Sequence, residues 1–218
     1  MRAVGSTVLA VLLLHLFKAS AWFQITPPTT KTDWMQTASL VVDVFDAPTK
    51  EAGPVERLAW KVVGRSLAEA SAYNQYVSTA RKMRGTKYAI LLAKSKWGQV
   101  VGMAELGMKL NQEGERRATI GVLCVDENYH KLGVGNALVC KCQEIVQAVW
   151  KEESISAEVE PCNGGAIAFF ESCGFQRMQG TRVMVSLRRG GRELEQRPHL
   201  LLTSNLTVGS HFLSEILA

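Results

Sequence analysis

The chain lacks the features that mark several common protein classes. Its longest apolar run, residues 8–17, is too short to cross a bilayer and is interrupted by His15. It has no internal repeat, which excludes solenoids and propellers. Its five cysteines all lie between Cys124 and Cys173, without the spacing of a metal site or a disulfide framework. We therefore expect reduced, mostly buried thiols and no bound metal.

The chain also lacks a strong charge imbalance. It has 25 Lys and Arg against 20 Asp and Glu, for a formal net charge of +5 over 218 residues. No concentrated basic patch stands out, so the mild excess favours an anionic small ligand over nucleic acid. With 47% hydrophobic and 21% charged residues, the composition is typical of one globular domain with short appendages.

No acidic residue precedes Asp33, and this N-terminal stretch has the pattern of a targeting segment. A positive start at Arg2 and the apolar run lead to a small-x-small cleavage site at residues 19–21. We predict a signal peptide over 1–21 and a transit-like segment or linker over 22–37, with no membrane attachment of the mature form. Such a bipartite presequence looks like those that address proteins to the plastids of some algae. Plain secretion is the alternative.

Hydrophobic periodicity divides the remaining chain into strands and helices. It predicts an α/β (α+β) domain over residues 38–188 and a C-terminal tail of unknown role over 189–218. The predicted strands cover residues 39–45, 87–93, 99–106, 118–125, 154–160 and 175–187. The predicted helices cover residues 55–83, divided into two helices, and then residues 133–152 and 166–173.

The most informative stretch runs from Val122 to Gly135, where an apolar strand meets a Gly-x-Gly turn directly before a helix. Glycines let the backbone turn tightly and approach a ligand. The first N–H groups of the following helix have no intrahelical partner and lie at the positive end of its dipole. A pyrophosphate fits such a turn, although an ordinary turn is the alternative explanation of this short motif.

A second motif follows later in the chain and runs from Asn163 through Phe170 to Gly174-Phe175. Together the two motifs resemble the GCN5-related N-acetyltransferases, the GNAT family. This resemblance implies a mixed central sheet of about six to seven strands, flanked by helices and splayed between strands four and five. It also implies acetyl-coenzyme A (acetyl-CoA) as the co-substrate. The chain departs from the family pattern at His130, where the family has Gln or Arg, and at Phe170, where it has Tyr.

The resemblance assigns the cofactor contacts. The backbone of the central strand would hold the pantetheine, the turn would hold the pyrophosphate, and Asn163 and Phe170 would complete the site. Asn163 has a second explanation as a plain helix N-cap. The strand residues in this prediction are Leu123, Cys124 and Val125, and the turn residues are His130, Lys131, Leu132, Gly133, Val134, Gly135 and Asn136.

The catalytic residues are less strongly indicated. Glu105 is a lone acid in an apolar strand, so it is either the general base or part of a solvent-facing side of that strand. Asp126 and Glu127, just after the central strand, are the other candidates for the base. Because Phe170 has no proton to give, Tyr129 or water would protonate the leaving thiolate.

These observations predict an acetyltransferase acting on a primary amine, preferably a protein N-terminus or a lysine. At pH 7 an α-amine costs about 1.4 kcal/mol to neutralise and a lysine about 4.6 kcal/mol, so the α-amine demands less of the enzyme. The Gly102-x-x-Glu105-Leu106 strand also resembles plastid protein acetyltransferases. The alternatives are a small-amine acetyltransferase, a regulatory module that binds CoA without catalysis, and a secreted binding domain. We expect a monomer or a weak dimer.

Overall fold

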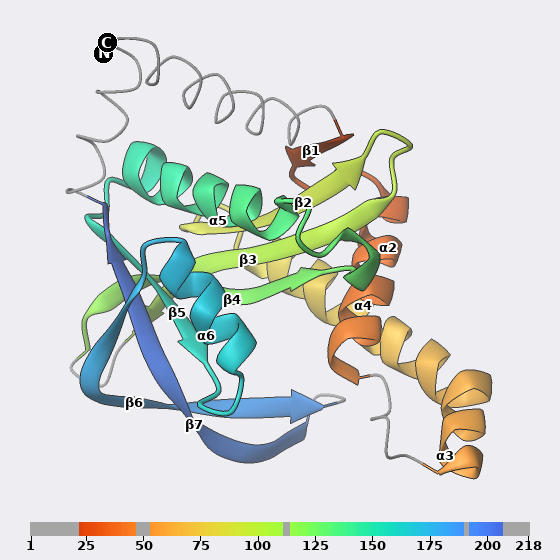
Figure 1. Ribbon diagram of the computed structural model, residues 1–218. Coiled ribbons are helices and arrows are strands. Elements are labelled where there is room, and N and C mark those ends of the chain that lie inside the picture. The colour runs from red at the N-terminus through yellow and green to blue at the C-terminus, as the bar shows by residue number, and fades with distance from the viewer. Residues whose placement is uncertain (1–21, 47–52, 111–113, 190–191, 207–218) are drawn as a thin grey trace, which may run out of the picture.

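The computed structural model describes residues 22–46, 53–110, 114–189 and 192–206. The strands of these residues form one mixed sheet in the order β1-β2-β3-β4-β5-β7-β6 (Figure 1). Among the described strands, β4 and β5 pair in parallel and the other neighbours pair antiparallel. The strands are β1 (Phe23–Thr26), β2 (Tyr88–Ser95), β3 (Val100–Leu110), β4 (Arg116–Val125), β5 (Ser154–Val159), β6 (Gln176–Arg189) and β7 (Arg192–Asn205).

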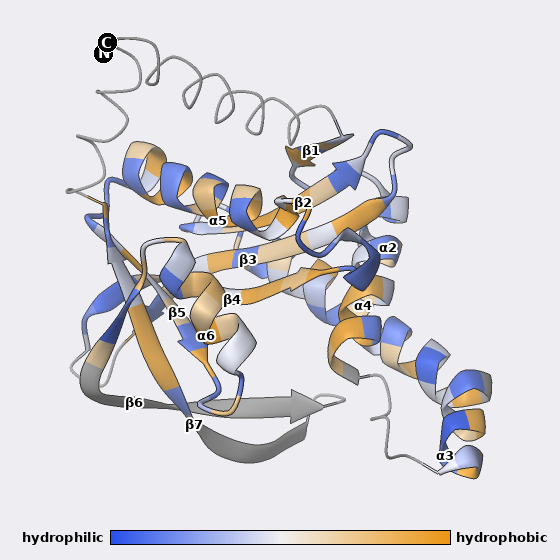
Figure 2. Ribbon diagram, in the orientation of Figure 1, coloured by the Kyte–Doolittle hydropathy of each residue, from blue (hydrophilic) through white to orange (hydrophobic). Residues whose placement is uncertain are grey.

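Helices cover both faces of the sheet. On one face, α2 and α4 pack against a cluster that includes Leu92 and Met103. On the other face, α5 and α6 pack against a larger cluster that includes Val101 and Leu106. Figure 2 shows hydrophobic residues along β3 and β4, between these two helical layers. The helices are α2 (Lys31–Val41), α3 (Pro54–Ala59), α4 (Arg65–Lys82), α5 (Val134–Glu144) and α6 (Gly164–Ser172), with π-helical extensions at Val42–Asp46, Trp60–Gly64 and Ile145–Trp150.

The predicted fold class is confirmed, but the predicted strand at 39–45 is wrong, because these residues continue α2. The helix begins at a capping box formed by Thr30 and Asp33. The Val and Phe residues of 41–45 favour a strand and misled the prediction. The Asp33 N–H donates to Thr30 Oγ1 at 3.1 Å, and the Thr30 N–H donates to Asp33 Oδ2 at 3.0 Å. Burial of Leu40 against the sheet, together with burial of Val42, then outweighs the strand propensity of this segment.

The sheet extends beyond both ends of the predicted 38–188 domain. Residues 22–37, predicted as a transit-like segment or linker, contain β1 and the first part of α2, and β1 pairs with β2. Residues 189–218, predicted as a tail, contain β7, which lies between β5 and β6. The predicted signal peptide over 1–21 lies outside the described residues.

An ion pair between a buried carboxylate and a half-buried lysine joins α2 to the sheet. Asp33 is 5% exposed, and its Oδ1 lies 2.7 Å from Lys94 Nζ on β2. Burial alone would raise the pKa of Asp33. The Lys94 ammonium and the N–H groups of Thr29 and Thr30 outweigh that effect and hold the pKa well below its usual value.

We expect Asp33→Asn to lower the free energy of unfolding by about 3 kcal/mol at pH 7, because the half-buried ammonium of Lys94 would lose its charged partner. The pKa of Asp33 is lower in the folded state, so its contribution is complete above the unfolded value of about 3.9 and declines as the pH falls below it. Urea unfolding at several pH values measures this decline. In the control Lys141→Gln, loss of the exposed pair with Glu144 should cost at most about 0.5 kcal/mol, and equal losses would contradict the assignment.

Candidate active site

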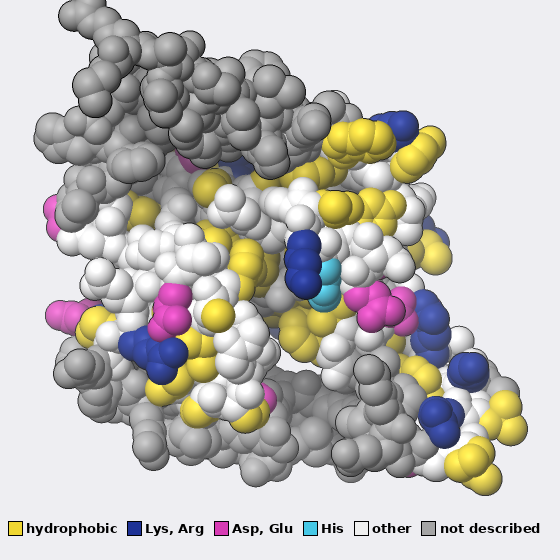
Figure 3. Space-filling model, viewed as in Figure 1, with side chains coloured by type: hydrophobic (Ala, Val, Ile, Leu, Met, Phe, Trp, Pro, Cys, Tyr) yellow, Lys and Arg dark blue, Asp and Glu magenta, His cyan; other side chains and the backbone are white. Residues whose placement is uncertain are grey.

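The two parallel strands separate toward their carboxyl ends. They pair over residues 118–120 of β4 and 155–157 of β5, whereas β4 continues to Val125 and β5 to Val159. A bulge at Gly121 begins the separation, because Glu105 of β3 pairs with Val122 and Leu106 pairs with Ile120. The predicted splay between strands four and five is therefore confirmed. Figure 3 shows the molecular surface hollowed between α6 and the end of β4.

The Gly-x-Gly turn lies at the start of α5 and faces solvent. Gly133 is the N-cap and has φ +83°, and Lys131 also has a positive φ of +60°. The first intrahelical hydrogen bond runs from the Ala137 N–H to the Gly133 carbonyl at 3.0 Å. Within the described part of the chain, the N–H groups of residues 131–136 donate no hydrogen bond of ordinary geometry. They are thus available to an anion, as expected at a helix N-terminus.

His130 contributes to this turn through its ring. Its backbone N–H already donates to the Glu127 carbonyl at 3.2 Å, so that group is occupied. Its Nε2 lies 2.9 Å from the Val125 carbonyl oxygen. Since a carbonyl only accepts, the ring donates as the Nε2–H tautomer or as the imidazolium. The side chain ties the turn back to the end of β4.

The central strand offers its backbone rather than reactive side chains. Leu123 and Val125 are half-buried and pack toward α5 and α6, whereas Cys124 is buried on the opposite face. Burial raises the pKa of the Cys124 thiol to about 12, so this thiol stays protonated and unreactive at neutral pH.

The residues of the second motif make structural contacts. Asn163 Oδ1 accepts the Ala166 N–H at 3.0 Å, which is the helix-capping alternative given above, and its exposed amide NH₂ still faces solvent. Phe170 is buried between Phe169 and Phe175, with ring centroids 5.4 and 5.1 Å apart. In the described structure it therefore packs the core beneath α6.

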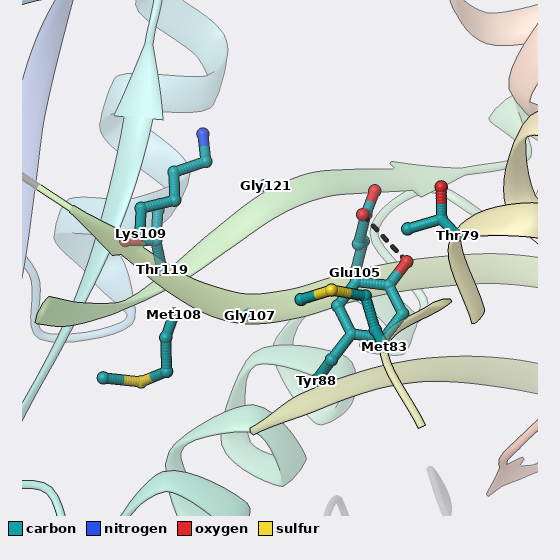
Figure 4. A pocket seen from close by; sticks show the side chains of 9 residues that line it. All are labelled: Thr79, Met83, Tyr88, Glu105, Gly107, Met108, Lys109, Thr119 and Gly121. Carbon is teal, nitrogen blue, oxygen red and sulfur yellow. Dashed lines mark hydrogen bonds between the residues drawn. The ribbon is translucent and has the colours of Figure 1, made fainter. Parts of the chain in front are cut away.

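Glu105 lies on the opposite face of the sheet, toward α4. It lines a cavity of about 200 Å³ (Figure 4). Its Oε1 accepts the Tyr88 hydroxyl at 2.9 Å. Burial raises the pKa of Glu105, against the opposing effects of Tyr88 and Lys109, and such a carboxyl suits a general base near neutral pH. The other residues lining the cavity are Thr79, Met83, Tyr88, Gly107, Met108, Lys109, Thr119 and Gly121.

The structure does not bring the two predicted catalytic side chains together. Tyr129 packs against the core on the α5 and α6 face, whereas Glu105 opens toward α4. Asp126 accepts the Asn128 N–H at 2.9 Å and so shapes the turn after β4. Sequence reasoning missed Tyr88. Antiparallel pairing of the predicted strands over 87–93 and 99–106 would have placed it near Glu105.

No described helix has the length and apolar character needed to cross a membrane. No group of three or more His, Cys, Asp or Glu side chains in this part of the chain could hold a metal ion.

Comparison with solved structures shows the same fold. A ribosomal-protein-alanine N-acetyltransferase from Brucella melitensis is 19% identical, with a TM-score of 0.56, over 84% of this chain and 99% of that one. A spermidine N-acetyltransferase SpeG chimera from Vibrio cholerae is 12% identical, with a TM-score of 0.56, over 86% and 99%. A chain of the NatC complex bound to Gag peptide and CoA is 18% identical, with a TM-score of 0.52, over 84% and 98%.

No curated protein matches the chain in a sequence search. The family model described as "Acetyltransferase (GNAT) family" matches residues 57–175, which is more than half of the chain. That range includes the strand with Glu105, the splay, the turn and α6. The protein therefore belongs to the GNAT family of acetyl-CoA-dependent N-acetyltransferases.

Proposed function

We propose that the protein acetylates a primary amine of a polypeptide, either an N-terminal α-amine or a lysine. The observation that carries the cofactor side of this proposal is the set of unpaired N–H groups at residues 131–136. They lie in the turn before α5 and in its first helical turn, and Gly133 provides no side-chain cap to this helix. Acetyl-CoA would supply an activated thioester there.

The residues of the chain divide the remaining work between the two faces of the sheet. The N–H groups at the start of α5 would bind the diphosphate, and backbone groups of residues 123–125 would orient the pantetheine through the splay. An N–H of that strand would polarise the thioester carbonyl, as oxyanion donors do. Glu105, on the α4 side, would take the proton of the incoming amine.

The polypeptide acceptor is supported by the cavity and by the amine chemistry. A cavity of about 200 Å³ admits the end of a chain or a single side chain, so most of a larger acceptor would lie outside it. The α-amine is also the easier amine to neutralise at pH 7. One structural neighbour is a ribosomal-protein-alanine N-acetyltransferase, and another is a chain of the NatC complex bound to a Gag peptide. Because a third neighbour is a spermidine N-acetyltransferase, a small polyamine is the second candidate for the acceptor.

Transfer of labelled acetyl groups tests the proposal directly. The protein would be mixed with isotope-labelled acetyl-CoA and three acceptors: peptides with free N-termini, lysine peptides with blocked N-termini, and spermidine. We expect label in one or both peptide arms. Label in spermidine alone would replace the polypeptide with a small amine. Tight CoA binding in a calorimetric titration, without transfer to any arm, would instead favour the regulatory module.

We further propose that residues 1–21 direct the protein to a plastid, with secretion as the alternative outcome. The predicted cleavage site at Ala21 lies just before β1, so removal of these residues would leave the sheet intact. A second cleavage after residue 37 would remove β1 and the buried Asp33. We therefore expect the mature protein to begin near Trp22, and N-terminal sequencing together with a fluorescent fusion would test both points.

A further inference from the structure

We propose that Tyr88 is a positioning residue for Glu105, holding one carboxylate oxygen so that the other is directed at the acceptor amine. This inference rests on the proposed function, because the base role of Glu105 belongs to it. In Figure 4 the two side chains point toward one another from neighbouring strands. Their hydrogen bond, from Tyr88 Oη to Glu105 Oε1, is 2.9 Å long.

The strand register explains how Tyr88 reaches Glu105. On β2 and β3, Ile90 is paired with Glu105 and Tyr88 with Gly107. A Cβ on Gly107 would lie 3.3 Å from Tyr88 Cδ2, closer than ordinary contact. The missing side chain at Gly107 therefore lets the phenol ring lie across β3 toward Glu105. Gly107 and Tyr88 act together as the support of the carboxylate.

The pairing also gives the carboxylate a direction. Among the described residues, Glu105 has its one recorded hydrogen bond at Oε1, so its Oε2 keeps its acceptor capacity. Both oxygens belong to a side chain that lines the cavity, at the level of the Gly121 bulge. A Cβ on Gly121 would lie 4.0 Å from Glu105 Cδ, so the carboxylate lies where β4 begins to leave β5.

Of the polar groups around this carboxylate, the Tyr88 hydroxyl is the principal hydrogen-bond donor. Burial and the nearby Glu105 raise the pKa of Tyr88 far above its usual value, so the phenol keeps its proton. Lys109 of β3 also favours the carboxylate, but its Nζ lies 2.6 Å from Glu158 Oε2 of β5. Tyr76 of α4 also raises the pKa of Tyr88. The residues of α4 and β4 that line the cavity are uncharged.

The variant Tyr88→Phe tests this role because it removes the hydroxyl and keeps the ring. We expect the pKa of Glu105 to rise by about one unit, since a hydrogen bond to a charged group is lost. Carbon-13 NMR of the Glu105 carboxyl in the free protein would measure it. The acid limb of the kcat/KM profile should move to higher pH by the same amount, while kcat well above that limb changes at most a few-fold.

Two further variants complete the test. Tyr73→Phe removes a phenol of α4 that does not line the cavity and should leave both the titration and the pH profile unchanged. Gly107→Ala should displace the ring and move the Glu105 titration in the same direction as Tyr88→Phe, which covers the case in which that variant does not fold.

An unchanged Glu105 titration in a folded Tyr88→Phe protein would overturn the proposal, even if activity fell. The titration needs no acetyl transfer, so it is independent of the proposed function. A shifted titration in a protein that acetylates no amine would retain the pairing and reject the base role of Glu105.

Discussion

Glu105→Gln is expected to lower kcat by about 10²–10⁴-fold, the usual contribution of a general base. Glutamine preserves the shape of the side chain and can still accept the Tyr88 hydroxyl, so the cavity should stay intact. The dissociation constant for CoA should change little, because the N–H groups of residues 131–136 lie at the start of α5, on the opposite face of the sheet from the Glu105 cavity. Steady-state kinetics and calorimetry would measure the two quantities separately.

The pH dependence sharpens this prediction. Because burial raises the pKa of Glu105, the rate of the unmodified protein should fall as the pH decreases through a value above that of an ordinary glutamate. The Gln variant should lose this acid limb. Glu144→Gln is a suitable control, since Glu144 is exposed at the end of α5 and pairs with Lys141. Rates that match the unmodified protein at every pH would reassign the base.

The sequence-based predictions succeed where the signal is local. The Gly-x-Gly turn requires a residue that tolerates a positive φ, and Gly133 adopts +83° at the start of the predicted helix. The strands β2 and β3 and the helices α5 and α6 depend likewise on short periodicity signals. These elements occupy the parts of the chain in which the sequence predicts them.

The predictions fail where distant residues decide the structure. The apolar run of β7 is not strongly periodic, and its place between β5 and β6 depends on pairings that no short window contains. The helix over 39–45 depends on the cap at Thr30 and on burial of Leu40 against the sheet. The pairing of Tyr88 with Glu105 depends on strand register.

The two halves of the site follow from one feature of the sheet. The bulge at Gly121 ends the pairing of β4 with β5 and also borders the cavity that contains Glu105. The turn over residues 130–136 follows the same strand, and His130 ties it to the Val125 carbonyl. Changes at the turn should therefore affect cofactor affinity first, and changes at the cavity should affect the chemical step.

Gly133→Val separates these contributions and should weaken CoA binding by about 10–100-fold. A β-branched residue strongly disfavours φ +83°, so the turn would relax and its N–H groups would move away from the positions proposed to bind the diphosphate. Loss of even one charge-assisted hydrogen bond of about 1.5–3 kcal/mol accounts for this range, at 1.4 kcal/mol for each factor of ten. Calorimetric titration with CoA measures the change.

The matched control is Gly98→Val in the β2–β3 hairpin. Gly98 has φ +79°, and a Cβ there would meet no atom within 4 Å, so the substitution introduces similar backbone strain away from the turn. Both variants should lose stability, whereas CoA affinity should fall in Gly133→Val alone. Substitution of Gly133 is a cleaner test of the turn than substitution of Gly135. A Cβ on Gly135 would lie 3.2 Å from the Phe169 ring and would disturb the contact between α5 and α6. Equal loss of affinity in both variants would show that strain, and not the geometry of the turn, controls binding.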